Sequence, residues 1–208
     1  MRNHQLLVSV LVALLPAAGM AAGDTVPCPD KKAGQWYRFA KTDLYNKTTE
    51  LLTKIDSVEG DRVIHNGGTF IADKMDNWHK LGERVATPKW YARIECPFSL
   101  GETRVYKDVD YDGVLRGAKT RGTFTVTVDP ELVSLTVRAG SFKVVKIVSD
   151  NSASGSDVRA PGGVWSGSIR SVSYYAPEIG ISVKTEIASA SPVRFRDVYE
   201  LLEYSLGD

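Results

Sequence analysis

The sequence predicts an all-β protein built on a single curved antiparallel sheet, either a half-barrel or a barrel-like meander. Three observations predict it: helical periodicity is scarce, apolar and polar residues alternate along many short segments, and turn residues recur about every ten positions. Alternation is typical of strands that bury one face. Short strands that follow one another through short turns favour an antiparallel meander.

The first segment has the pattern of a cleavable secretory signal peptide, which we predict to span residues 1–22. Arg2 precedes the uncharged run Leu6–Leu15, and Gly19-Met20-Ala21 fits the small-x-small rule for cleavage. A bilayer-spanning helix needs about 20 apolar residues, and Pro16 interrupts this run earlier. A retained anchor is the alternative, but no basic stop-transfer flank follows. We therefore expect a periplasmic or secreted protein with no membrane span after cleavage.

The rest of the chain, residues 23–208, is predicted to form one β-rich domain, because its length is that of an ordinary single domain. The sequence has 26 basic and 25 acidic side chains and a formal net charge of +1. A nucleic-acid-binding protein would show a basic patch, and an anionic membrane would attract a polybasic stripe. Neither partner is implied.

Cys28 and Cys96 are the two cysteines of the chain. In an exported domain a lone pair of cysteines favours a disulfide, and we predict a Cys28–Cys96 bond. Two buried thiols or a labile redox pair are the alternatives. Thr25-Val26-Pro27 lacks the small residues that precede a lipid-attachment cysteine, so we expect no lipid anchor.

The individual strands follow from alternation in chain order. It is clearest at residues 123–128 and 181–187. Further strands are predicted at Trp36–Phe39, Leu51–Val58, Arg62–His65, Thr69–Ala72, Arg104–Val109, Val133–Val137 and Phe142–Val148. Turns are predicted at Glu59-Gly60-Asp61, Asn66-Gly67-Gly68, Asp112-Gly113, Asp129-Pro130-Glu131 and Ala139-Gly140.

The strand Phe142–Val148 is apolar on both faces, since Phe142 and Val144 point opposite to Val145 and Ile147. Both faces therefore need cover. Either the sheet closes on its own side chains, or a ligand or partner lies against the strand.

Two segments near the C-terminal end need separate interpretation. Residues 149–163 are rich in Ser, Gly and Asp and predict a long, mobile hairpin loop. Residues 197–206 fit either a strand or a capped helix, because Asp197 and Glu200 have the spacing of a capping box. We favour the strand.

Two stretches of the last third resemble a known family. Val137–Ile147 reads V-R-A-G-S-F-K-V-V-K-I, Tyr174–Lys184 reads Y-Y-A-P-E-I-G-I-S-V-K, and a terminal E-L-x-x-Y begins at Glu200. These segments resemble uncharacterised periplasmic proteins of the DUF3108-like kind. Arg138 replaces a usual proline and Tyr174 a usual tryptophan. The resemblance implies a bacterial envelope protein on a curved antiparallel sheet, and it implies no known activity.

The strongest metal-like motif is Asp108-Val109-Asp110-Tyr111-Asp112-Gly113, which has the D-x-D-x-D-G pattern of a calcium loop. Such a loop needs a bidentate carboxylate at its twelfth position. Lys119 stands there, and Arg116 adds a second positive charge. We favour a hairpin turn over a calcium site.

Other chemical signatures are weak. His65 and His79 are not in a zinc-ligand spacing; we interpret His65 as a strand-end residue and His79 as a surface loop residue. No G-x-S-x-G motif or other short catalytic signature occurs. We therefore predict no enzyme, no cofactor and no metal, although a triad assembled from distant positions leaves no such signature.

Two functional hypotheses follow from different classes. The first is a non-catalytic exported envelope protein that binds an apolar ligand or envelope component in the sheet's concavity. The second is a structural or assembly accessory protein that contacts a protein partner through sheet edges and the 149–163 loop. A continuous apolar pocket would favour the first, and an exposed apolar patch or unpaired edge the second. An enzyme of unspecified type is the third.

Overall fold

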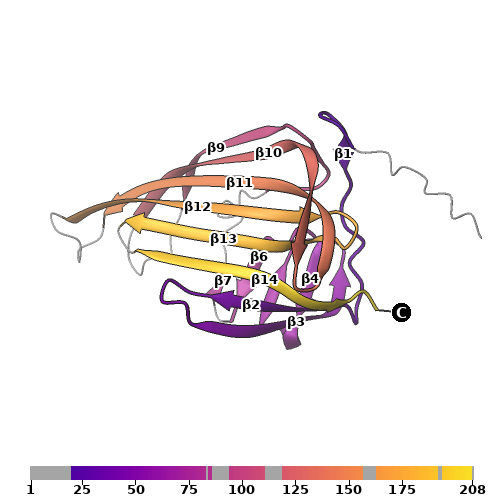
Figure 1. Ribbon diagram of the computed structural model, residues 1–208. Helices are drawn as coiled ribbons and strands as arrows, with labels where there is room; N and C mark the ends of the chain where they lie inside the picture. The colour runs from indigo at the N-terminus through magenta and orange to yellow at the C-terminus, as the bar shows by residue number, and fades with distance from the viewer. Residues whose placement is uncertain are drawn as a thin grey trace, which may run out of the picture.

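Two antiparallel meanders make up the protein, as the computed structural model shows for residues 20–82, 84–85, 94–110, 119–156, 163–191 and 194–207 (Figure 1). They join into one curved 12-stranded sheet, and β1 and β8 form a separate two-stranded sheet. The predicted all-β class is therefore confirmed. The large sheet does not close into a barrel, because β7 and β9 remain as its two edges.

The strands and the 3₁₀ turn η1 have the following bounds: β1 Thr25–Val26, β2 Trp36–Thr42, β3 Thr48–Glu59, β4 Arg62–His65, η1 Asn66–Gly68, β5 Phe70–Ala72, β6 Trp78–Leu81, β7 Arg84–Val85, β8 Phe98–Ser99, β9 Thr103–Asp110, β10 Lys119–Val137, β11 Gly140–Ser156, β12 Val164–Ala176, β13 Ile181–Ser191 and β14 Phe195–Ser205. In the described part of the chain no helix is long and apolar enough to cross a membrane.

The first and last strands of the large sheet in sequence order, β2 and β14, lie next to each other in the interior of the sheet. Strands β2 to β7 follow one another in space, as do β9 to β14, and the two groups are joined where β14 pairs with β2. All neighbouring strands are antiparallel. The last strand thus connects the N-terminal and C-terminal halves of the protein.

The segment 197–206 lies in this joining strand through Ser205, so the strand interpretation is confirmed and the helix is wrong. Its side chains alternate between two faces and its backbone pairs on both sides, with β13 and with β2. A capping box is a weak local signal that sheet pairing on both sides overrides.

The predicted turn at Asp129-Pro130-Glu131 is wrong, because β10 runs through it without reversing. The register with β11 shifts between Val128 and Leu132, so the three residues form a bulge. Proline has no N–H to donate and is therefore tolerated at a bulge. The bulge lies where β10 and β11 bend sharply toward β14 (Figure 1).

The predicted loop at residues 149–163 is also wrong over residues 149–156. These residues belong to β11, and they pair with β10 on one side and with β12 on the other. Their Ser, Gly and Asp content suggested a loop, but pairing with two long strands satisfies the backbone whatever the side chains are. Residues 157–162 lie outside the described residues.

The hairpins β2–β3 and β5–β6 close with the same five-residue turn. Asp43 begins one turn and Asp73 the other, and each carboxylate accepts hydrogen bonds from the backbone N–H groups two and four residues later, at 2.8–2.9 Å. The fourth residue is Asn46 (φ 61°) or Asp76 (φ 60°). Asn and Asp tolerate this left-handed conformation better than most residues. The turn fixes the position of Asp76, which matters below.

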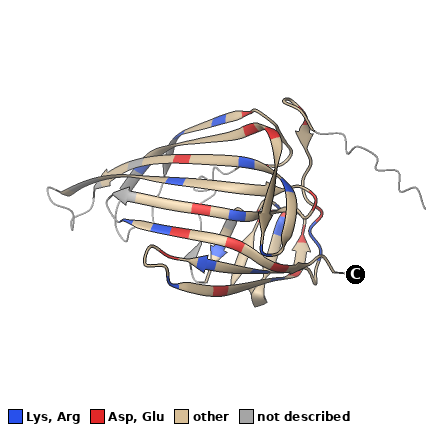
Figure 2. Cartoon of the chain, in the orientation of Figure 1, with Lys and Arg blue, Asp and Glu red and all other residues tan. Residues whose placement is uncertain are grey.

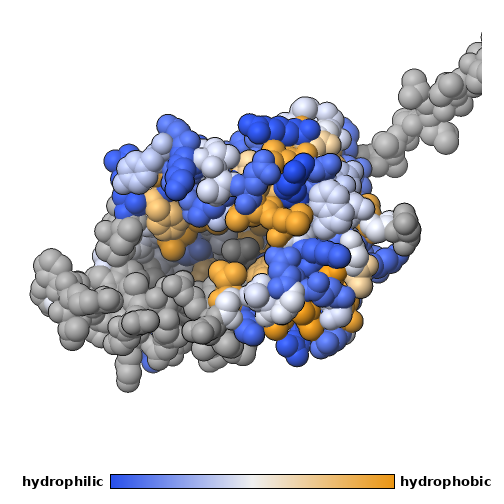
Figure 3. Space-filling view, turned by 90° about the horizontal axis from the view of Figure 1, so that it is seen from below, coloured by the Kyte–Doolittle hydropathy of each residue, from blue (hydrophilic) through white to orange (hydrophobic). Residues whose placement is uncertain are grey.

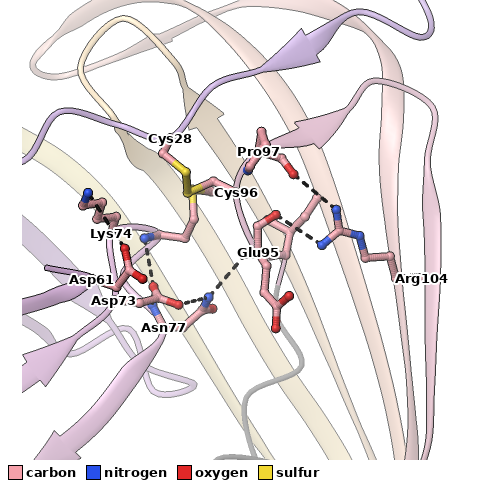
Figure 4. The surroundings of a disulfide bond; sticks show 11 residues. Cys28, Asp61, Asp73, Lys74, Asn77, Glu95, Cys96, Pro97 and Arg104 are labelled. Carbon is pink, nitrogen blue, oxygen red and sulfur yellow. Dashed lines mark hydrogen bonds and ion pairs between the residues drawn. A yellow bond between two sulfur atoms is a disulfide. The ribbon is translucent and has the colours of Figure 1, made fainter.

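The predicted Cys28–Cys96 disulfide is confirmed (Figure 4). It ties residues 27–35, which we call the N-terminal segment, to residues 94–97, which precede β8. That second segment is also held by side chains: Asn77 donates to the Ile94 carbonyl at 3.3 Å, and Arg104 of β9 donates to two backbone carbonyls at 3.2 and 3.4 Å. The bond therefore links the N-terminal segment to both meanders.

Gly180, in the turn between β12 and β13, meets this N-terminal segment. Its φ is +69°, and a Cβ built there would lie 2.5 Å from Cβ of Pro29. We expect Gly180→Ala to lower the free energy of unfolding by about 2–3 kcal/mol, from backbone strain plus overpacking. Gly60→Ala is the matched control, because Gly60 has a φ of +64° but open space around it, so only about 1 kcal/mol should be lost. Urea unfolding measures both, and equal losses would show that Pro29 does not pack against Gly180.

Candidate functional site: the inner face of the sheet

Strand register divides the side chains of the large sheet between an inner and an outer face. Val145 pairs with Tyr175, and both are buried on the inner face. In the view of Figure 1 this face of β11–β14 is turned toward β4 and β6, which lie behind it. Val63 of β4 belongs to the same buried cluster as Val183 and Leu201, which agrees with this arrangement.

The outer face carries charges of both signs, as Figure 2 shows along the strands. Neighbouring charges pair across strands: Arg170 with Asp150 at 3.3 Å, and Arg196 with Glu186 at 3.4 Å. Lys184 pairs with Glu186 along one strand at 2.9 Å, and hydrogen bonds from Lys184 and Arg196 help hold the pKa of Glu186 below its usual value. The outer face is therefore a solvated, mutually neutralised surface.

One half of the inner face is filled by two clusters of buried side chains, and we call it the filled half. The first cluster consists of Tyr37, Ile55, Val63, Val137, Phe142, Val144, Ala176, Ile179, Ile181, Val183 and Leu201. The second consists of Val26, Ile94, Phe98, Leu100, Val126, Val128, Val145, Ile147 and Tyr175.

The strand predicted to need cover on both faces is covered by the protein itself. Phe142 and Val144 lie in the first cluster, and Val145 and Ile147 in the second. The tip of the β10–β11 hairpin folds over the sheet: the Ala139 N–H donates to the Leu201 carbonyl at 3.2 Å. A ligand or partner is therefore not needed as a lid over this strand.

The inner face changes character beyond the two clusters, in what we call the open half. Four hydroxyl residues of β11–β13 take inner-face positions there: Ser149, Ser171, Ser173 and Thr185. They are half-buried, and the Ser173 and Thr185 hydroxyls are 3.2 Å apart. Apolar residues lie on either side of these hydroxyls. Two of them, Ile169 and Leu51, are each 40% exposed. Inner-face positions of a sheet are normally apolar, so this half is not packed as a core.

A charged pair stands at the β2–β14 side of the open half. Lys41 Nζ lies 2.9 Å from Asp197 Oδ2 and 5.7 Å from the ring centre of Tyr199. The side chains of Lys41 and Asp197 are 32% and 22% exposed. The hydrogen bond to Asp197 raises the pKa of Lys41. The open half thus combines a lysine held as a cation with hydroxyl and apolar groups.

Figure 3 shows a recess in the molecular surface, seen from below, with hydrophobic residues on two sides. A separate open groove of about 550 Å³ lies on the outer face; its lining residues are Gly34, Trp36, Arg38, Leu52, Lys54 and Glu203. Arg38 in this groove already pairs with Glu203 and Glu50. The Arg38 charge is therefore already neutralised, whereas the open half is lined by half-buried polar groups.

A buried polar cluster links the N-terminal segment to the filled half. The Lys31 side chain is 1% exposed, and its Nζ lies 3.1 Å from Asp76 and 5.2 Å from the ring centre of Tyr37. Burial, followed by the nearby Asp76 charge, raises the pKa of both Tyr37 and Tyr175. Burial lowers the pKa of His65, which favours the neutral imidazole. Asp76 neutralises the one buried cation of this cluster, so we assign the pair a structural role.

The residues singled out in the sequence lie apart from the open half. His65 ends β4, as predicted for a strand-end residue, and its side chain is buried. His79 is exposed but lies in β6, so its assignment to a loop is wrong; β6 pairs with both β5 and β7. Asp108 and Asp110 lie in β9, while residues 111–118 of the calcium-like motif lie outside the described residues. Among the described residues no three His, Cys, Asp or Glu side chains are grouped to hold a metal.

Sequence reasoning missed Lys31, Lys41 and Asp197. A lysine in a strand ordinarily points to solvent, and only the register of β2 with β14, which are far apart in sequence, brings Lys41 beside Asp197. A signal for Asp76 existed: both five-residue turns read D-x-x-[ND]-x, although neither was identified as a turn.

The sheet defines an all-β protein. Its disulfide is consistent with an extracytoplasmic location. In overall shape the chain is similar to two solved bacterial structures. One is a presumed lipoprotein from Parabacteroides distasonis, at 11% identity and a TM-score of 0.45, covering 88% of this chain and 100% of that one. The other is a presumed exported protein with a YmcC-like fold from Bacteroides fragilis, at 12% identity and a TM-score of 0.37, covering 89% and 99%.

No family model and no curated protein matches the chain. The resemblance to DUF3108-like proteins therefore stays a prediction.

Proposed function

We propose that this protein is a non-catalytic binding protein of the cell envelope, and that the open half of its inner face binds an amphiphile with an acyl chain and a polar head. The observation that carries the proposal is the change along the inner face from fully buried apolar clusters to half-buried hydroxyl, aromatic and apolar residues. Surface of this kind costs little in water and still offers apolar area to a chain.

The polar residues refine the ligand class predicted from sequence. A purely apolar ligand would cut the hydroxyls of Ser171 and Ser173 off from water and leave Ser173 only its bond to Thr185, which costs free energy. An amphiphile can place its head group against these hydroxyls and against Lys41, while its chain contacts Ile169 and Ile187. Hence the chemistry of the lining favours an amphiphile over a hydrocarbon.

The periplasm is the compartment we propose, because the predicted signal peptide directs export and the Cys28–Cys96 bond persists in oxidising compartments. The alternative is an assembly accessory protein that contacts its partner through sheet edges and the 149–163 loop. The edges β7 and β9 are present, but the loop has less support. Residues 149–156 are paired on both sides within the sheet and have no free backbone edge to offer.

A tryptophan at position 171 should fill the open half. We expect Ser171→Trp to weaken binding of a dansyl-labelled undecanoic acid at least tenfold in a fluorescence titration of the mature protein, because the indole occupies the space of the chain. Arg170→Trp is the matched control: the preceding residue of β12 points to the outer face and is exposed, so affinity should not change.

Circular dichroism spectra and unfolding midpoints of both variants establish that they are folded. No saturable binding of the probe by the wild-type protein would contradict the proposed function. Equal loss of affinity in the two variants would place the probe elsewhere than on the inner face.

A further inference from the structure

His65, at the end of β4, is a buried histidine whose ring makes no polar contact in the part of the chain that the structure describes. It is 1% exposed, and neither ring nitrogen has a hydrogen-bond partner there. The ring packs against Phe70 of β5, with the ring centres 4.8 Å apart. Histidine ordinarily gains its charge between about pH 5 and about pH 8. A buried imidazole with no acceptor placed for its N–H groups is costly to charge.

Three charged side chains act on His65 from the neighbouring elements: Lys31 of the N-terminal segment, Asp56 of β3 and Asp76 of the turn between β5 and β6. Asp56 is exposed, and its Oδ2 accepts a hydrogen bond from the Gly67 N–H at 2.6 Å. Lys31 is buried, and its Nζ lies 3.1 Å from Asp76. The buried lysine therefore already uses the carboxylate that could neutralise a charged His65.

The closed structure thus disfavours the charged form of His65. Burial lowers the pKa of His65, and the Asp76 charge, which raises it, does not offset the burial; the Lys31 charge lowers it further. Opening of the surrounding structure exposes the ring to water, where its pKa returns to the ordinary value of about 6.5. The open form then binds the proton more readily than the closed form, so acid shifts the equilibrium toward the open form. Above about pH 6.5 neither form holds this proton, and the closed form keeps its full stability.

Strands β4 and β5 are the part of the fold around His65 that is best placed to open. They have four and three residues, and they lie in the part of the large sheet that ends at the edge strand β7. Short strands close to an edge open locally at a lower free energy than the core does. Their opening also separates Lys31 from Asp76, while the Cys28–Cys96 bond keeps the N-terminal segment attached.

We propose that His65 is a pH-sensitive switch: below about pH 6.5, protonation of its imidazole opens strands β4 and β5 and releases Lys31 from its buried position. The switch rests on the charge balance of the cluster, in which a charged His65 is a second cation beside the carboxylate that Lys31 already uses. It requires no bound ligand and stands apart from the proposed function.

Hydrogen exchange of the mature, oxidised protein tests the opening. After correction for the pH dependence of intrinsic exchange, we expect the opening constant of the β4 and β5 amides to rise by up to about tenfold from about pH 7.5 to about pH 5.5, because one proton is bound on opening. The amides of β12 and β13 should keep their opening constants, since both strands pair on both sides. An opening constant of β4 and β5 that does not change with pH would overturn the proposal.

Substitution of the histidine identifies the titrating group. His65→Phe removes that group and keeps an aromatic ring against Phe70, so the opening constant of β4 and β5 should no longer depend on pH. His65→Gln serves as a second variant if the phenylalanine disturbs the fold. His79→Gln is the matched control, because His79 is exposed and is the other histidine of the predicted mature chain; it should keep the wild-type pH dependence. A pH dependence that survives both substitutions of His65 would assign the switch to another group and overturn the proposal.

Lys31→Met separates the effect of charge from the effect of burial. Without the buried cation, Asp76 can neutralise a charged His65, so the pH dependence of opening should be weaker than in the wild type. The ring-proton NMR signals of His65 give a direct readout: they should titrate at lower pH in the native wild-type protein than in free histidine, and at higher pH in Lys31→Met than in the wild type. Titration of native His65 at or above its ordinary value of about 6.5 would contradict the proposal, as would an unchanged titration in Lys31→Met.

Discussion

Replacing Asp76 with asparagine is expected to lower the free energy of unfolding by about 3 kcal/mol, because it leaves a buried lysine without its counter-charge. Lys31 is 1% exposed and lies 3.1 Å from Asp76, which is itself 35% exposed. This partial exposure keeps the expected loss at the lower end of the range for buried pairs. Asparagine tolerates the φ of 60° at this position, so the turn itself should be kept. Urea unfolding at neutral pH gives the measurement.

The neighbouring pair Lys32–Asp30 is a matched control with the same 3.1 Å separation, but its side chains are 63% and 83% exposed. Asp30→Asn should therefore change stability by less than about 0.5 kcal/mol. Adding Lys31→Met to Asp76→Asn should restore part of the loss, because the buried charge is then gone. Equal small effects of Asp76→Asn and Asp30→Asn would contradict the assignment of Lys31 as a buried, Asp76-dependent cation.

Loss of the disulfide is expected to lower the free energy of unfolding by about 4 kcal/mol. The bond joins residues 68 positions apart, and closing a loop of this length removes roughly that much chain entropy from the unfolded state. Cys28→Ser/Cys96→Ser should therefore unfold at a lower urea concentration than the oxidised wild-type protein.

Reductant supplies the control for this prediction. Dithiothreitol should lower the stability of the wild-type protein to that of the double variant, and it should leave the double variant unchanged. A double variant as stable as the oxidised protein would show that the bond constrains neither meander. Two alkylatable thiols in exported, unreduced protein would show that the bond does not form in the cell.

The fold class could be predicted because alternation of apolar and polar residues is clear within two of the long strands, at residues 123–128 and 181–187. The predictions were wrong where the amino-acid composition of a segment favours a turn or a loop but its backbone belongs to a paired strand. Asp129-Pro130-Glu131 has turn chemistry, yet it forms a bulge in β10. Residues 149–156 have loop composition, yet β10 and β12 enclose them. Local residue preference is weak compared with pairing on both sides, and pairing with distant strands leaves no local signal.

The candidate site was harder to predict than the fold. The hydroxyls of Ser171 and Ser173 look like solvent-facing residues of an alternating strand, because alternation alone does not tell the inner face from the outer one. Only the curvature of the sheet and its strand order show that they share a face with Val145 and Tyr175. Of the two alternatives for covering Phe142–Val148, coverage by the protein itself is the one observed, since the hairpin tip folds back onto Leu201.

Methyl NMR of isoleucine-labelled mature protein, titrated with a spin-labelled stearic acid, tests the central claim most directly. The chain carries isoleucines in both halves of the inner face: Ile169 and Ile187 in the open half, and Ile55 and Ile181 in the filled half. The methyl signals of Ile169 and Ile187 should broaden in a saturable manner, while those of Ile55 and Ile181 stay sharp. Saturable broadening at Ile55 and Ile181, or none at Ile169 and Ile187, would contradict a ligand site in the open half.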